Sequence, residues 1–98
     1  MKKELEMIQQ MEEIAHRASQ VFESLERSLE LFEELEPDFK QLVAYYDRDW
    51  MRHYEMENRG EFPCNVSRGV LGQDTIYNLM VVRRELLSEM ARLSEKER

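Results

Sequence analysis

Apolar residues recur with a helical period through the first third of the chain, and this pattern constrains the fold more than any other feature. Between Met7 and Leu35 they follow the spacing i, i+1, i+4, i+7. All but one of the positions in the pattern are apolar, and the exception is Ser28: Met7, Ile8, Met11, Ile14, Ala15, Ala18, Val21, Phe22, Leu25, Ser28, Leu29, Phe32 and Leu35. The pattern predicts one long amphipathic helix with an apolar face wide enough to contact two neighbouring helices.

Proline, glycine and aspartate residues predict where the other helices begin and end. The first helix, residues 3–36, is expected to end before Pro37, because a proline disfavours the α conformation of the preceding residue. A second helix is predicted over residues 37–57, either unbroken or broken near Asp47, which can cap a new turn. A third helix is predicted over residues 73–95.

Residues 58–72 form the connection between the second and third predicted helices. This segment contains all three glycines of the chain and is much longer than the usual connection of about four to six residues. We expect the glycines to adopt positive φ values. We also expect the loop to pack against the helices, because four of its residues are apolar: Phe62, Val66, Val70 and Leu71.

Composition places the chain among single helical domains. It has 98 residues, 42% of them hydrophobic, and a net charge of −7, which disfavours binding to nucleic acid or to anionic lipid. The single cysteine, Cys64, excludes an internal disulfide and fits a reducing compartment. The N-terminus lacks the apolar run of a signal peptide, and no segment approaches the ~20 apolar residues of a membrane span. We therefore expect one soluble, cytoplasmic domain over residues 1–98, with no membrane contact.

The charges differ between the ends of the chain. Residues 1–36 carry ten acidic and four basic groups, whereas residues 75–98 carry four acidic and five basic groups. The third helix can therefore pack against the first without repulsion, and the predicted fold is an all-α, three-helix antiparallel bundle with a long N-terminal helix. Because the first helix is about ten residues longer than the third, part of its apolar face stays uncovered, and this predicts a homodimer through the first helix.

Residues 45–80 resemble the signature of a known family. The relevant residues are Tyr45-Tyr46, Trp50, Tyr54-Glu55, Gly60, Pro63, Arg68-Gly69-Val70-Leu71, Asp74 and Ile76-Tyr77-Asn78-Leu79. This run is similar to that of short bacterial all-helical proteins classed as a domain of unknown function. Gly72-Gln73 replaces the Ser-Glu of the family pattern, which weakens the predicted cap of the third helix. The resemblance implies a bacterial, cytoplasmic, all-α domain, and it implies no reaction.

The residues that commonly carry chemistry form no known motif. His16, His53 and Cys64 lack the spacing of a zinc site, and Cys64 has only Arg59 and Arg68 nearby in sequence to stabilise a thiolate. Acidic residues gather at the expected turn between the first two helices: Glu33, Glu34, Glu36 and Asp38. A solvated turn explains them as well as a metal role does. We therefore expect no catalytic residues, no metal and no cofactor.

Most aromatic residues gather close to the glycine-containing loop. Five of the nine lie at Tyr45, Tyr46, Trp50, Tyr54 and Tyr77. One interpretation is that Trp50 and two tyrosines form the core that holds the loop. The other is that these five residues and Arg68 form a partner-binding patch, since tyrosine, tryptophan and arginine are frequent in binding hot spots. Arg68 is also suited to a structural role, bonding loop carbonyls or a carboxylate.

These observations lead to two functional hypotheses of different classes. The first is a non-enzymatic protein–protein interaction or regulatory module that self-associates through the first helix. The alternative is a small metal-binding protein or metal-dependent enzyme that uses helical carboxylates and His16 or His53.

Overall fold

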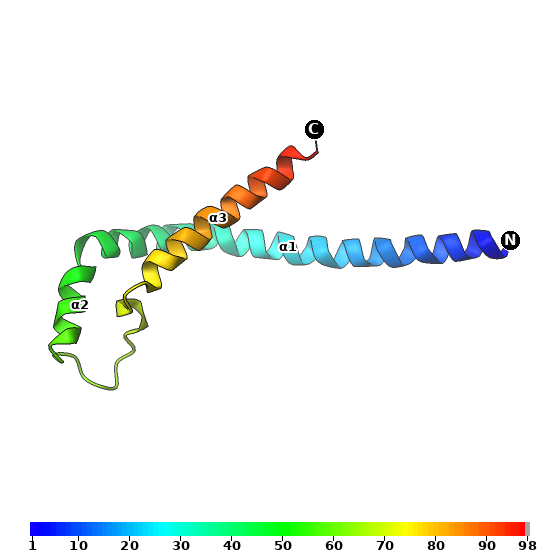
Figure 1. Cartoon of the computed structure of the whole chain (residues 1–98). Coiled ribbons are helices and arrows are strands. Elements are labelled where there is room, and N and C mark those ends of the chain that lie inside the picture. The colour runs from blue at the N-terminus through cyan, green and yellow to red at the C-terminus, as the bar shows by residue number, and fades with distance from the viewer. Residues whose placement is uncertain (98) are drawn as a thin grey trace. The chain divides into compact units, whose positions relative to one another are not determined.

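The computed structural model describes residues 1–97 as an all-helical chain, in which no strand occurs. Figure 1 traces its elements in order: α1 (Lys2–Arg48), α2 (Trp50–Asn58), the 3₁₀ turn η1 (Gly69–Leu71) and α3 (Thr75–Glu95). The all-α class and the long N-terminal helix are confirmed. The antiparallel bundle stays a prediction. None of the helices in the described part of the chain is long and apolar enough to cross a membrane.

The predicted end of the first helix at Pro37 is wrong, because Pro37 lies inside α1. A proline within a helix removes one backbone hydrogen bond and costs about 3 kcal/mol. The apolar pattern nevertheless continues in register past the proline, from Leu35 to Phe39 and Leu42 at spacings of four and three. Pro37 itself is exposed, on the polar side of this pattern. The continuous apolar stripe therefore outweighs the local helix-breaking tendency.

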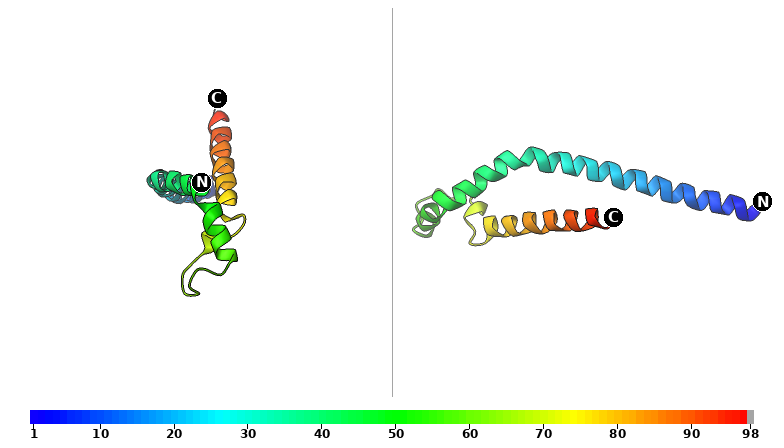
Figure 2. Two further views of the ribbon diagram at one scale, coloured as in Figure 1. Left: turned by 90° about the vertical axis from the view of Figure 1, so that its left-hand side faces the viewer. Right: turned by 90° about the horizontal axis from the view of Figure 1, so that it is seen from above.

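The break predicted near Asp47 occurs two residues later, at Asp49. The backbone hydrogen bonds nearly continue through it, because Asp49 N–H donates to Tyr45 O at 2.9 Å and His53 N–H donates to Asp49 O at 3.1 Å. The Asp49 side chain makes no helix cap. It instead lies 3.0 Å from Arg52 in an ion pair. Figure 2 shows α2, in bright green, turning away from the end of α1.

The chain divides into two compact units, Met1–Pro37 and Asp38–Arg98. The first, which we call the N-terminal arm, is a single stretch of α1 in which no residue is buried. The second, which we call the C-terminal unit, contains the last part of α1 together with α2, η1 and α3.

A small core holds the C-terminal unit together. Its buried residues are Trp50, Leu71 and Ile76, with 6%, 8% and 1% of their surface exposed. Each comes from a different element: α2, η1 and α3. Partly buried side chains pack around these three: Leu42, Tyr45, Tyr46, Tyr54, Phe62 and Met80. Leu71 and Phe62 therefore pack the loop against the helices as expected, whereas Val66 and Val70 are 50% and 43% exposed.

Only one glycine has the positive φ that was expected of all three. Gly60 has a φ of 72° and closes α2: Gly60 N–H donates to Glu57 O at 2.9 Å and Glu61 N–H to Met56 O at 3.1 Å. This pairing is a Schellman motif. Gly72 has a φ of −58°, so a positive φ does not explain the glycine at this position, and steric crowding does. A Cβ atom there would lie 2.6 Å from Thr75 Oγ1.

Candidate functional site

Trp50 joins α2 to the far end of the loop. Its indole N–H donates a hydrogen bond to the carbonyl oxygen of Val70 at 2.8 Å, which connects residues twenty apart in the sequence. Its ring stacks on Tyr54, with centroids 4.9 Å apart and planes at 16°. The centroids of the Trp50 and Tyr46 rings lie 5.4 Å apart. Since Tyr46, Trp50 and Tyr54 are spaced four residues apart, the helical period brings all three rings together.

Arg68 also connects the loop to α2. Its Nη1 donates to two loop carbonyls, that of Pro63 and that of Val66, the latter at 3.2 Å. Its Nε lies 2.6 Å from Glu57 Oε2, and both side chains are about one-third exposed or less. Nε makes no hydrogen bond, so Glu57 is its charge partner only. The guanidinium group therefore stabilises the loop conformation.

Tyr45 and His53 form a hydrogen-bonded pair beside this loop. The Tyr45 hydroxyl lies 2.8 Å from His53 Nδ1, and the two rings are 5.5 Å apart. Burial raises the pKa of the Tyr45 phenol, the Asp49 carboxylate raises it further, and Arg52 opposes the shift. The pair borders a depression of about 210 Å³ with mainly apolar walls: Tyr45, His53, Phe62, Val66, Ser67, Arg68, Val70 and Leu71.

The structure therefore brings together five of the six residues that the sequence suggested for binding. Trp50 is buried, whereas Tyr45, Tyr46, Tyr54 and Arg68 are partly exposed around the same core. Tyr77 is different: 52% of it is exposed, and it lies outside this aromatic cluster. Sequence reasoning considered His53 only as a metal ligand and did not single out Glu57. The one available signal is helical spacing, which places His53 two turns after Tyr45.

The residues considered for metal binding or nucleophilic chemistry do not converge. No group of three or more His, Cys, Asp or Glu side chains that could hold a metal ion occurs in residues 1–97. Cys64 is exposed. The expected turn that would gather Glu33, Glu34 and Asp38 does not exist, because α1 continues through them.

The N-terminal arm carries a second candidate surface. Nine large apolar residues of its periodic stripe are between 42% and 67% exposed: Met7, Ile8, Met11, Ile14, Val21, Phe22, Leu25, Leu29 and Leu35. If each exposes on the order of 80 Å², the stripe presents roughly 700 Å² of apolar surface, more than a typical monomer leaves in one patch.

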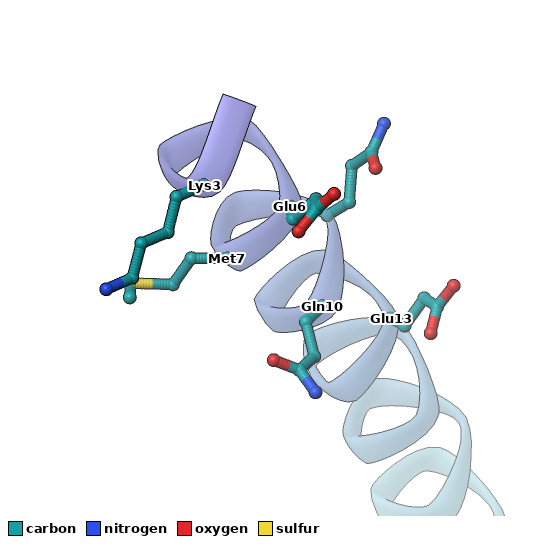
Figure 3. Close-up of a pocket in the computed structure, with 6 residues that line it drawn as sticks. Lys3, Glu6, Met7, Gln10 and Glu13 are labelled. Atoms are coloured by element: carbon teal, nitrogen blue, oxygen red, sulfur yellow. The ribbon is translucent and has the colours of Figure 1, made fainter. Parts of the chain in front are cut away.

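A depression of about 480 Å³ at the start of this arm is not an enclosed pocket. Its walls all come from one helix: Lys3, Glu6, Met7, Gln9, Gln10 and Glu13. Figure 3 shows Lys3 and Met7 projecting to the same side of that helix, with Gln10 on a following turn. A space bounded by the side chains of one helix cannot enclose a substrate, and Met7 alone among these residues belongs to the apolar stripe.

Comparisons with known proteins are informative at the level of the family. Neither the comparison with curated proteins nor the comparison with solved structures gave a match. A family model described as "Domain of unknown function (DUF4298)" matches residues 8–93, which covers most of the N-terminal arm and nearly all of the C-terminal unit. The resemblance to a domain of unknown function is thereby confirmed, and the chain belongs to this family.

Proposed function

We propose that the protein is a non-enzymatic interaction module that self-associates through the apolar stripe of α1. The observation that carries this proposal is that the N-terminal arm has a helical stripe that is apolar at every position but Ser28, and no buried residue. A stripe that gains nothing within its own unit has to be covered by another surface to stabilise the helix. Burying ~700 Å² on each of two helices would contribute tens of kcal/mol before the cost of association, since each Å² is worth about 25 cal/mol.

The test is sedimentation over a range of concentrations, with variants on opposite faces of the arm. Val21→Gln combined with Leu25→Gln introduces polar groups on the stripe, at side chains that are 60% and 52% exposed. His16→Gln combined with Glu23→Gln is the matched control, at two exposed positions on the face opposite the stripe. We expect wild type and control to dimerise and the stripe variant to need more than about tenfold higher concentration. A wild-type chain that remains monomeric at high micromolar concentration would refute self-association.

A second contact surface is proposed at Arg68 and the aromatic cluster of Tyr45, Tyr46, Trp50 and Tyr54, with Tyr77, outside the cluster, as a further candidate. Because Trp50 is buried, a partner protein would contact the exposed rim rather than the indole. The depression of about 210 Å³ has the size to accept one apolar side chain from such a partner. Val66 lies on its rim and is 50% exposed, so Val66→Asp should weaken partner binding without unfolding the unit. Equal affinity of Val66→Asp and wild type for an isolated partner would argue against this surface.

A further inference from the structure

The stripe of the N-terminal arm has chemically different edges. We assign heptad letters with Met11 at position a, Ile14 at d and Ala15 at e, so that a, d and e form the apolar face. One edge of this face consists of the g positions and contains two cations and no carboxylate: Lys3, Gln10, Arg17, Ser24 and Leu31. The other edge consists of the b positions and contains three carboxylates and no cation: Leu5, Glu12, Ser19, Glu26 and Glu33.

From this asymmetry we infer that the occupant of the stripe is a second copy of the chain, with its N-terminal arm parallel and in register. In a parallel pair, the g edge of each helix lies along the e edge of the other, next to the b positions. The cationic edge of each copy then faces the acidic edge of its partner. An antiparallel pair places g against g and e against e, which brings the two acidic edges together.

The complementarity belongs to the two edges as a whole. Lys3 and Arg17 on the g edge of one copy lie along the edge of the second copy that carries Glu12, Glu26 and Glu33. Single exposed ion pairs contribute little energy, but two facing edges of opposite charge favour one orientation over the other. The long stems of Gln10 and Arg17 also cover the apolar e residues that a two-helix seam leaves at its margin.

This inference rests on the proposed self-association and adds the orientation of the two copies. Disulfide formation tests it, in a Cys64→Ser background so that the exposed native thiol does not interfere. Met7→Cys and Ser28→Cys each introduce one thiol at a d position, and the two positions are about 31 Å apart along the helix. In a parallel, in-register dimer each thiol meets its own counterpart, so both variants should form covalent dimers in a glutathione buffer. Glu23→Cys, on the opposite face, should not.

Antiparallel helices cross their own counterpart at one point only, so linking at only one of the two positions would overturn the parallel arrangement. So would the absence of linking in a parent that sediments as a dimer. A monomeric parent would instead refute the self-association itself, which keeps the two failures distinct. As a second readout, Arg17→Glu places a carboxylate on the cationic edge of each copy and should raise the dimer dissociation constant roughly three- to tenfold. Adding Glu12→Arg, on the facing edge and about 7.5 Å away along the axis, should restore it. No restoration would contradict the facing of these two edges.

Discussion

Replacing Trp50 by alanine should unfold the C-terminal unit or bring it close to unfolding. The indole is 6% exposed, stacks on Tyr54 and donates to Val70 O at 2.8 Å. Removing a buried large aromatic costs about 3–5 kcal/mol, and leaving its acceptor without a donor adds about 1 kcal/mol. A unit of residues 38–98 is expected to have a total stability of only roughly 3–9 kcal/mol. One substitution therefore removes most of it.

Urea unfolding followed by far-UV circular dichroism measures this loss, with tyrosine emission as a second probe. All four tyrosines lie in the C-terminal unit, so their emission does not depend on the N-terminal arm. Met51→Ala is the matched control, because the neighbouring Met51 is 58% exposed and its truncation should change stability by less than about 0.5 kcal/mol. Trp50→Phe keeps most of the ring and should lose only ~1–2 kcal/mol. If Trp50→Ala stays within about 1 kcal/mol of wild type, the indole is not the anchor of the loop and the reasoning is refuted.

Three further substitutions test the contacts around this core, each by urea unfolding. Tyr45→Phe should cost about 1 kcal/mol through loss of the bond to His53. The same substitution should reduce the loss of stability at alkaline pH. Folding raises the pKa of the Tyr45 phenol above its value near 10 in the unfolded chain. The phenol therefore contributes its full stability below about pH 10, and this contribution is lost as the pH rises through the pKa of the folded state. An unchanged alkaline limb would contradict this. Gly60→Ala should cost about 1–2 kcal/mol because of the φ of 72°, and Gly60→Asn less; equal losses would argue against a conformational cause. Gly72→Ala should cost ~1–3 kcal/mol by crowding Thr75 Oγ1, and Thr75→Ala should recover most of that loss if the clash is the cause.

The sequence predicted the helical class because its apolar spacing is regular over most of the chain, and it misplaced boundaries where two local signals compete. At Pro37 the proline favours an end, whereas the apolar spacing continues in register through it, and the helix follows the apolar spacing. Asp47 and Asp49 are equally good caps by composition. The position of the break depends on a tertiary contact, because the Trp50 indole has to be placed within hydrogen-bond distance of the Val70 carbonyl.

The candidate site was predictable as a group of residues but not as a geometry. The spacing of Tyr46, Trp50 and Tyr54 is enough to place three rings on one helical face. Whether that face is core or binding surface depends on the path of the loop, and sequence does not specify that path. Arg68 illustrates the limit: its type suits carbonyl and carboxylate bonding, but its partners, Pro63, Val66 and Glu57, become evident only in the structure.

The N-terminal arm cannot owe its helix to its own charge pattern. Between residues 12 and 34, two pairs of charges at i, i+4 are favourable, Glu13 with Arg17 and Glu23 with Arg27. Two others are unfavourable, Glu26 with Glu30 and Glu30 with Glu34. Each pair contributes about 0.2–0.5 kcal/mol in either direction, so together they nearly cancel. Intrinsic propensity favours a helix here but does not require apolar residues at every third and fourth position. That regularity has an energetic effect only when the stripe is covered, and the cations on one edge with carboxylates on the other suit coverage by a parallel copy of the same helix.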